Sequence, residues 1–145
     1  MVEIKINYEG DLHCNNTHEP SKSEFATDAP VDNNGRGESF SPTDLLATAL
    51  GSCMATIMGI VAQRKDLDLT GMNITVGKHM SDTQPRRVSQ LDVRIEMPLL
   101  EDHPDRKVLE SSALSCPVHQ SIHPEIKVPI DWVWRTRATR AMADD

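Results

Sequence analysis

The amino-acid sequence predicts an α+β protein with antiparallel sheets around a long central helix. The first observation behind this prediction is a run of uncharged residues, 45–63, between Asp44 and Arg64. The second is the alternation of apolar and polar residues on both sides of that run, which is typical of half-buried strands. A length of 145 residues suits one hydrophobic core. We therefore expect a single domain over residues 1–135 and a C-terminal tail over residues 136–145.

The composition disfavours several classes of partner. Aromatic residues make up only 3% of the chain, so the core must be aliphatic and stacking platforms for bases are not expected. A net charge of −7 repels nucleic acid and anionic lipid, and we expect neither nucleic acid nor a membrane as a partner. Three scattered cysteines cannot form a disulfide framework, and the first ten residues lack the pattern of a signal peptide. The expected compartment is the reducing cytoplasm.

The N-terminal third is polar and rich in turn residues. Its first segment, MVEIKINYEG, alternates as a strand does, and short hairpin strands are predicted around Asp11–Cys14 and Glu24–Thr27, followed by a loop at Val31–Ser39. Ser41 then predicts the start of the long helix. Pro42 suits the first helical position, and an acid three residues after the serine completes a pair resembling a capping box.

The long helix is expected to end near Lys65. Its uncharged stretch is close to the ~20 residues that span a bilayer, but hydroxyl-bearing residues interrupt it, notably Thr48, Ser52 and Thr56. A helix packed on several sides therefore fits better than a membrane span. One small sheet cannot cover such a helix, so we expect a homodimer that buries two copies of it together.

The C-terminal half predicts a hairpin, a short helix, a further helical turn and a last strand. The predicted segments are Met72–Ser81, Arg87–Met97, Asp105–Ser115, Val118–Ile122 and Val128–Arg135.

Two cysteines in this pattern could carry chemistry. Cys53 lies twelve residues past the predicted cap, about 18 Å along the helix, where the helix dipole no longer stabilises a thiolate. A reactive Cys53 therefore needs a cation or hydrogen-bond donor from another segment. The alternative is that Cys53 is a small, inert core residue. Cys116 lies 63 positions later, beside Pro117, where the predicted helix breaks or restarts.

A metal site is a weaker alternative. Cys116, His119 and His123 have a spacing that could ligate zinc. A fourth ligand could come from the N-terminal third, which offers Cys14, His13 and His18. The adjacent proline disturbs the spacing and no second cysteine pair is present, so surface or capping histidines are the favoured interpretation.

The segment Ser41–Ala55, SPTDLLATALGSCMA, resembles the central-helix motif of the OsmC/Ohr family, and Ser115–His119, SCPVH, resembles its second-cysteine motif. The resemblance covers residues 2–135. It implies an intertwined α+β homodimer that reduces organic hydroperoxides. By analogy Cys53 is the peroxidatic cysteine and Cys116 the resolving one. A lipoyl-type dithiol or another small thiol is the implied reductant, and no metal or organic cofactor is implied.

The chain also departs from this family pattern. Well-characterised members place a glutamate ten positions before the reactive cysteine, where this chain has Thr43, and use an arginine from the N-terminal strands, whereas residues 1–35 contain none. We predict that Arg36 with Glu38 substitutes for that pair, or that Arg86 or Arg87 does.

These departures favour a rival hypothesis. In it, the chain is a non-catalytic protein of the same fold that binds a small apolar or electrophilic ligand at the dimer interface, with its cysteines acting as sensors or as packing. Under either hypothesis Cys14 is expected to have no role. His119 could assist proton transfer when Cys116 reacts, although the sequence alone favours no such role.

Overall fold

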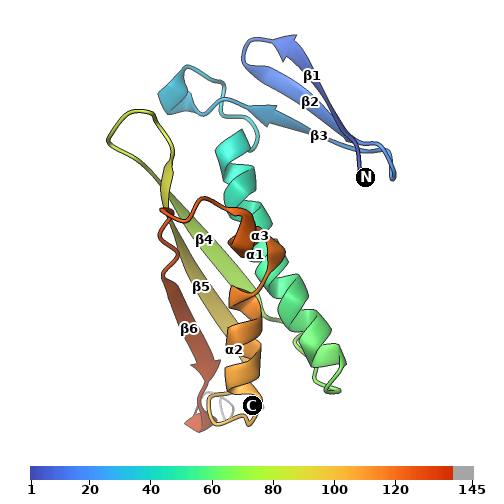
Figure 1. The fold of residues 1–145 in the computed structure, drawn as a ribbon, viewed down its shortest axis with the longest axis vertical. Helices are drawn as coiled ribbons and strands as arrows, with labels where there is room; N and C mark the ends of the chain where they lie inside the picture. Colours follow the sequence, from blue (N-terminus) through green and yellow to red (C-terminus); the bar gives the residue numbers. More distant parts are fainter. Residues whose placement is uncertain (139–145) are drawn as a thin grey trace. The chain divides into compact units, whose positions relative to one another are not determined.

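The computed structural model describes residues 1–138, which form two compact units, Met1–Leu46 and the chain from Ala47 onward. In chain order the elements are β1 (Ile4–Gly10), β2 (His13–His18), β3 (Ser23–Asp28), η1 (Val31–Asn33), α1 (Pro42–Gln63), β4 (Asn73–Met80), β5 (Val88–Leu100), α2 (Arg106–Leu114), α3 (Pro117–Ser121) and β6 (Ile130–Arg135) (Figure 1). The predicted tail lies mostly at positions 139–145, outside the described residues.

The first unit is built on an antiparallel sheet in the order β1-β2-β3. The predicted strand at Asp11–Cys14 is wrong at its start, because Asp11 and Leu12 have positive φ angles of 50° and 61° and form the turn between β1 and β2. Such left-handed backbone does not fit a strand. Strand β2 therefore begins at His13 and continues to His18, beyond the predicted end.

One face of this sheet carries four exposed apolar side chains. Ile4, Ile6 and Tyr8 alternate along β1, and the strand register places Asn16 between Ile6 and Phe25 on the same face. The side chains of Ile6 and Tyr8 are both 62% exposed, and Phe25 is 47% exposed. We call Ile4, Ile6, Tyr8 and Phe25 the apolar face of the first unit.

The start of α1 confirms the predicted capping box. The backbone N–H of Ser41 donates to Asp44 Oδ2 at 2.8 Å, and the N–H of Asp44 donates to Ser41 Oγ at 3.1 Å. These reciprocal bonds satisfy two donors that a helix N-terminus otherwise leaves unpaired. The helix ends at Gln63, two residues before the expected Lys65.

The second unit has a three-stranded sheet in the order β4-β5-β6, with α1 packed against it. Gly51 makes that contact close, since a Cβ at this position would lie 3.0 Å from Val76 Cγ2 and 3.4 Å from Ile74 Cγ2. The largest fully buried apolar side chains of this unit come from α1, β5 and α2: Leu50, Met54, Met58, Leu91, Ile95 and Leu109.

The expectation of purely antiparallel sheets is wrong for one strand pair. Strands β4 and β5 form the predicted antiparallel hairpin, but β6 runs parallel to β5, pairing Ile130 with Val93 and Trp132 with Ile95. A parallel pair needs a long crossover, and the chain supplies one by passing through α2 and α3 before it returns to the sheet. This sheet is therefore mixed.

Helix α1 is buried on one side only. Its most apolar window has a mean hydropathy of 2.0, and one third of that window is buried. By length and composition α1 could therefore cross a membrane, but the core helix of a soluble protein passes the same test. Thr48, Ser52, Thr56 and Ile60 recur at helical spacing and are exposed; we call them the exposed stripe of α1.

Candidate active site

Cys53 lies in the middle of α1, in the second unit. The helical period places it between the buried side, which carries Leu50 and Met54, and the exposed stripe, which carries Ser52 and Thr56. Its side chain is accordingly half-buried. A thiol at this edge of the helix can be reached by a small molecule while the helix backbone holds it in place.

Cys116 is fully buried and stands at the start of α3. Its backbone is extended, with φ −63° and ψ 142°, and Pro117 occupies the first helical position, so Cys116 is the N-cap residue. The thiol replaces the usual capping oxygen, because the backbone N–H of His119 donates to Cys116 Sγ at 3.3 Å. The proline thus restarts a helix here, one of the two outcomes that the sequence allowed.

Cys53, 63 positions earlier in the sequence, lies near enough to Cys116 to affect the pKa of its thiol. Burial raises the pKa of the Cys116 thiol, and the hydrogen bond and charge of Cys53 raise it further against the lowering effect of the His119 N–H. Cys116 is therefore held as a neutral thiol at neutral pH. The pair is asymmetric, with one accessible sulfur and one buried, protonated sulfur.

His119 has a feature that the sequence did not indicate. Its ring is half-buried, and its Nδ1 atom is buried without a hydrogen-bond partner, the only such side-chain nitrogen or oxygen among residues 1–138. The sequence favoured a surface or capping histidine. Its backbone N–H agrees with a role at the helix cap, because it donates to Cys116, but its ring does not lie fully at the surface. Sequence periodicity could not reveal this, because α3 has only five residues.

Arg36 and Glu38 belong to the first unit. The Arg36 guanidinium forms an ion pair with Asp11, at 3.0 Å between Nη2 and Oδ2. The side chain of Glu38 is exposed, and its backbone N–H donates to Asp28 Oδ2 at 3.2 Å. The prediction that these two residues stabilise a Cys53 thiolate stays a prediction.

Arg86 and Arg87, the alternative cations, lie in the turn between β4 and β5. The guanidinium of Arg87 donates to Thr83 Oγ1 at 3.2 Å and to the carbonyl of Pro85 at 3.3 Å, so the turn itself holds it. The backbone N–H of Arg86 donates to Gln84 Oε1 at 3.1 Å.

A carboxylate that the sequence did not single out organises the first unit. Asp28 is 2% exposed; one of its oxygens bonds to His13 Nδ1 and the other accepts the N–H of Glu38. The hydrogen bond from His13 holds the pKa of Asp28 below its ordinary value. Nothing in the sequence signals this pair, because it depends on the register that sets His13 opposite Asp28.

The geometry gives the zinc alternative no support. Within the described part of the chain, no three His, Cys, Asp or Glu side chains gather in a way that could hold a metal ion. His123 is exposed, and its Nδ1 accepts the backbone N–H of Glu125 at 3.2 Å.

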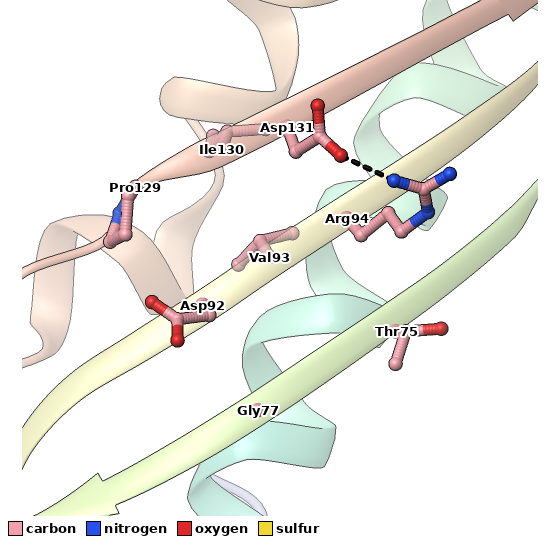
Figure 2. A pocket seen from close by; sticks show the side chains of 8 residues that line it. All are labelled: Thr75, Gly77, Asp92, Val93, Arg94, Pro129, Ile130 and Asp131. Carbon is pink, nitrogen blue, oxygen red and sulfur yellow. Dashed lines mark hydrogen bonds and ion pairs between the residues drawn. The ribbon is translucent and has the colours of Figure 1, made fainter.

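A shallow trough of about 490 Å³ lies on the sheet of the second unit, lined by residues of β4, β5 and the start of β6 (Figure 2). Gly77 is among its lining residues, and an ion pair joins two others, Arg94 and Asp131. No thiol lines it.

The fold and the site together define an α+β protein with two neighbouring thiols, one on a long helix and one capping a short helix. The family model for OsmC-like proteins matches residues 35–131. This chain belongs to the OsmC-like protein family.

Solved structures agree with this assignment. A protein from Psychrobacter arcticus, provisionally named for osmotic stress induction and detoxification response, shares 45% identity and a TM-score of 0.86. That match covers 91% of this chain and 96% of the other. No protein of curated function matches this chain.

Two more distant structures share the fold alone. The organic hydroperoxide resistance protein OsmC of Legionella pneumophila is 15% identical with a TM-score of 0.74, over 92% of this chain and 96% of the other. An organic hydroperoxide resistance protein of Elizabethkingia anophelis is 13% identical with a TM-score of 0.69, over 93% and 96%.

Proposed function

We propose that this protein is a thiol-dependent peroxidase that reduces organic hydroperoxides. The observation that carries the proposal is that the half-buried Cys53 lies near the buried Cys116 and raises the pKa of its thiol. Membership of the OsmC-like family supports it, since structures that share its fold are named organic hydroperoxide resistance proteins.

The reaction follows from the asymmetry of the two thiols. The Cys53 thiolate attacks the O–O bond of the hydroperoxide, the alcohol leaves, and Cys53 becomes a sulfenic acid. Cys116 then attacks that sulfur, so that an S–S bond forms, the S–O bond breaks and water leaves. An external dithiol, of lipoyl type or another small thiol, reduces the disulfide and restores both cysteines.

The two sulfurs are suited to different steps. The peroxidatic sulfur must meet a substrate, and Cys53 is the more accessible of the pair. The resolving sulfur must wait unreacted until the sulfenic acid forms beside it. Burial of Cys116 and the raised pKa of its thiol protect it from direct oxidation, because the thiolate is the reactive form.

We propose further that the protein acts as a cytoplasmic homodimer. Two surfaces support the dimer, each considered within its own unit: the apolar face of the first unit and the exposed stripe of α1. The exposed apolar area of the first unit is typical of surfaces that a partner covers. A second copy of the chain is the partner proposed here.

A non-catalytic binding function is the second candidate. Thr43 stands where related peroxidases carry a glutamate. The guanidinium of Arg36 is paired with Asp11, and that of Arg87 is bonded within its own turn. In this alternative a small apolar or electrophilic ligand binds near Cys53 and no turnover follows.

Mass spectrometry decides between the two candidates. Protein with Cys14→Ser is treated with one equivalent of cumene hydroperoxide and is then analysed intact, under denaturing conditions, with peptide mapping. The proposed peroxidase loses two hydrogens and gains a Cys53–Cys116 cross-link, whereas Cys116→Ser stops at an oxidised Cys53. Unmodified thiols with no hydroperoxide consumed would refute the peroxidase and favour the binding protein.

A further inference from the structure

The second chemical step of the proposed cycle presents a difficulty. Cys116 must lose its proton before its sulfur can attack Cys53, since the thiolate is the nucleophile in disulfide formation. Yet Cys116 is fully buried, and burial raises the pKa of its thiol. Without a base to remove its proton, the Cys116 sulfur is a poor nucleophile at neutral pH. A base close to Cys116 would remove the difficulty.

His119 lies beside Cys116. Its backbone N–H donates to Cys116 Sγ at 3.3 Å, so its main chain contacts the reacting sulfur and its side chain starts next to it. Its side chain turns partly inward, with Nδ1 buried and unpartnered. A buried polar atom without a partner costs folding free energy, and a catalytic role is one of the recognised reasons for keeping it.

The other histidine on this segment lacks these features. The His123 ring is exposed, and its Nδ1 already accepts the N–H of Glu125. Histidine is the side chain whose ordinary pKa best suits proton transfer near neutral pH. His119 is therefore the residue of α3 that combines a backbone contact with the sulfur and a buried ring nitrogen that forms no other hydrogen bond.

We propose that His119 is the general base that takes the proton from the Cys116 thiol as that sulfur attacks Cys53. In the resolving step, the proton passes from Cys116 to His119 and then to the hydroxide that leaves the Cys53 sulfenic acid, giving water. The S–S bond forms, the S–O bond breaks, and His119 ends the step unchanged. This role rests on the proposed function for its setting, but its chemistry can be measured without any peroxide.

The test uses an aromatic disulfide, dithiobis(nitrobenzoate), in a Cys14→Ser background. Cys53 attacks the reagent first, releases one coloured thiolate and keeps the other as a mixed disulfide. Cys116 then attacks that mixed disulfide and releases the second thiolate, so the second phase reports the loss of the Cys116 proton. The leaving thiolate needs no proton, which isolates the role of the base.

The decisive variant is His119→Asn, because it keeps the backbone N–H to Cys116 and places an amide near the position of Nδ1, but removes the basic nitrogen. We expect the first phase to be unchanged and the second to slow by about 10²-fold, the lower end of general-base effects. His123→Asn is the matched control and should leave both phases unchanged.

Rescue separates chemistry from structure. Free imidazole should accelerate the second phase of His119→Ala and leave that of wild type unchanged. Each protein serves as its own reference in this comparison, so a loss of stability cannot imitate rescue. A second phase in His119→Asn within twofold of wild type, or no acceleration of His119→Ala by imidazole, would overturn the proposal.

The same proteins distinguish this proposal from the peroxidase itself. If the second phase depends on His119 but cumene hydroperoxide leaves Cys53 unmodified, the base is established and the peroxidase fails. If hydroperoxide is consumed and His119→Asn forms the disulfide as fast as wild type, the peroxidase stands and the base fails.

Discussion

The two units of the chain bury opposite kinds of residue. Every buried hydrophobic side chain lies at Ala47 or beyond, in the second unit. The buried residues of the first unit are polar: Asn16, Thr27, Asp28 and Ser41. Its large apolar side chains, Ile6, Tyr8 and Phe25 among them, are exposed instead. The second unit therefore holds a core of its own, whereas the first depends on specific hydrogen bonds and on whatever covers its apolar face.

This contrast bears on the proposed chemistry. Both reacting cysteines belong to the unit with the aliphatic core, where packing fixes side chains closely. The predicted substitutes Arg36 and Glu38 belong to the other unit, in the exposed segment after η1. A sulfur–sulfur step needs fixed geometry, so its placement in the well-packed unit is physically reasonable.

The largest expected effect is in the core of the second unit. Leu91→Ala removes a fully buried side chain of β5, and we expect the free energy of unfolding to fall by about 2–5 kcal/mol. Urea denaturation followed by circular dichroism measures this loss. Ile6→Ala is the matched truncation in the first unit. The comparison is made at a protomer concentration low enough to dissociate the proposed dimer. If Ile6→Ala then lowered the free energy of unfolding as much as Leu91→Ala does, the contrast between the units would be contradicted.

The apolar face of the first unit should respond to charge at high protein concentration. Ile6→Asp places a carboxylate in that face, and we expect the proposed dimer to dissociate at concentrations where wild type is associated, because burying an unpaired charge is costly. Sedimentation velocity over a dilution series measures the shift. Asn7→Asp is the control, since Asn7 lies on the opposite face of β1. If both variants dissociate equally, the apolar face is not the interface.

The capping box at the start of α1 predicts a smaller effect. Ser41→Ala removes the oxygen that accepts the Asp44 N–H, and we expect a loss of about 1 kcal/mol in the free energy of unfolding. Thermal unfolding measures it. Asp44→Asn is the partner variant, because it keeps an acceptor for the Ser41 N–H while removing the charge near the helix N-terminus. A loss at Ser41 no greater than at Asp44 would show that the charge matters more than the hydroxyl.

The sequence predicted some features because their physics is local. The capping box and the β4–β5 hairpin depend on residues close together in the chain, and both are present. The parallel placement of β6 was not predicted, because alternation identifies a strand but not its direction. The inward turn of the His119 ring and the pairing of His13 with Asp28 depend on tertiary packing and strand register. Neither the ring orientation nor the pairing can be predicted from the order of the residues.

The smallest effect concerns acid. Because the hydrogen bond from His13 lowers the pKa of Asp28 in the folded protein, the ionised Asp28 stabilises the fold above the unfolded pKa of about 3.9. That contribution is lost as the pH falls through the lower, folded pKa. Asp28→Asn should therefore be less stable than wild type near neutral pH, and the difference should shrink as the pH is lowered below about 4. Urea midpoints over a pH series measure the difference. Asp82→Asn, at an exposed carboxylate of the β4–β5 turn, should show no such convergence. A difference for Asp28→Asn that stayed constant down to the lowest pH would mean that the His13 bond does not hold the charge of Asp28, and that the first unit is organised by its other hydrogen bonds.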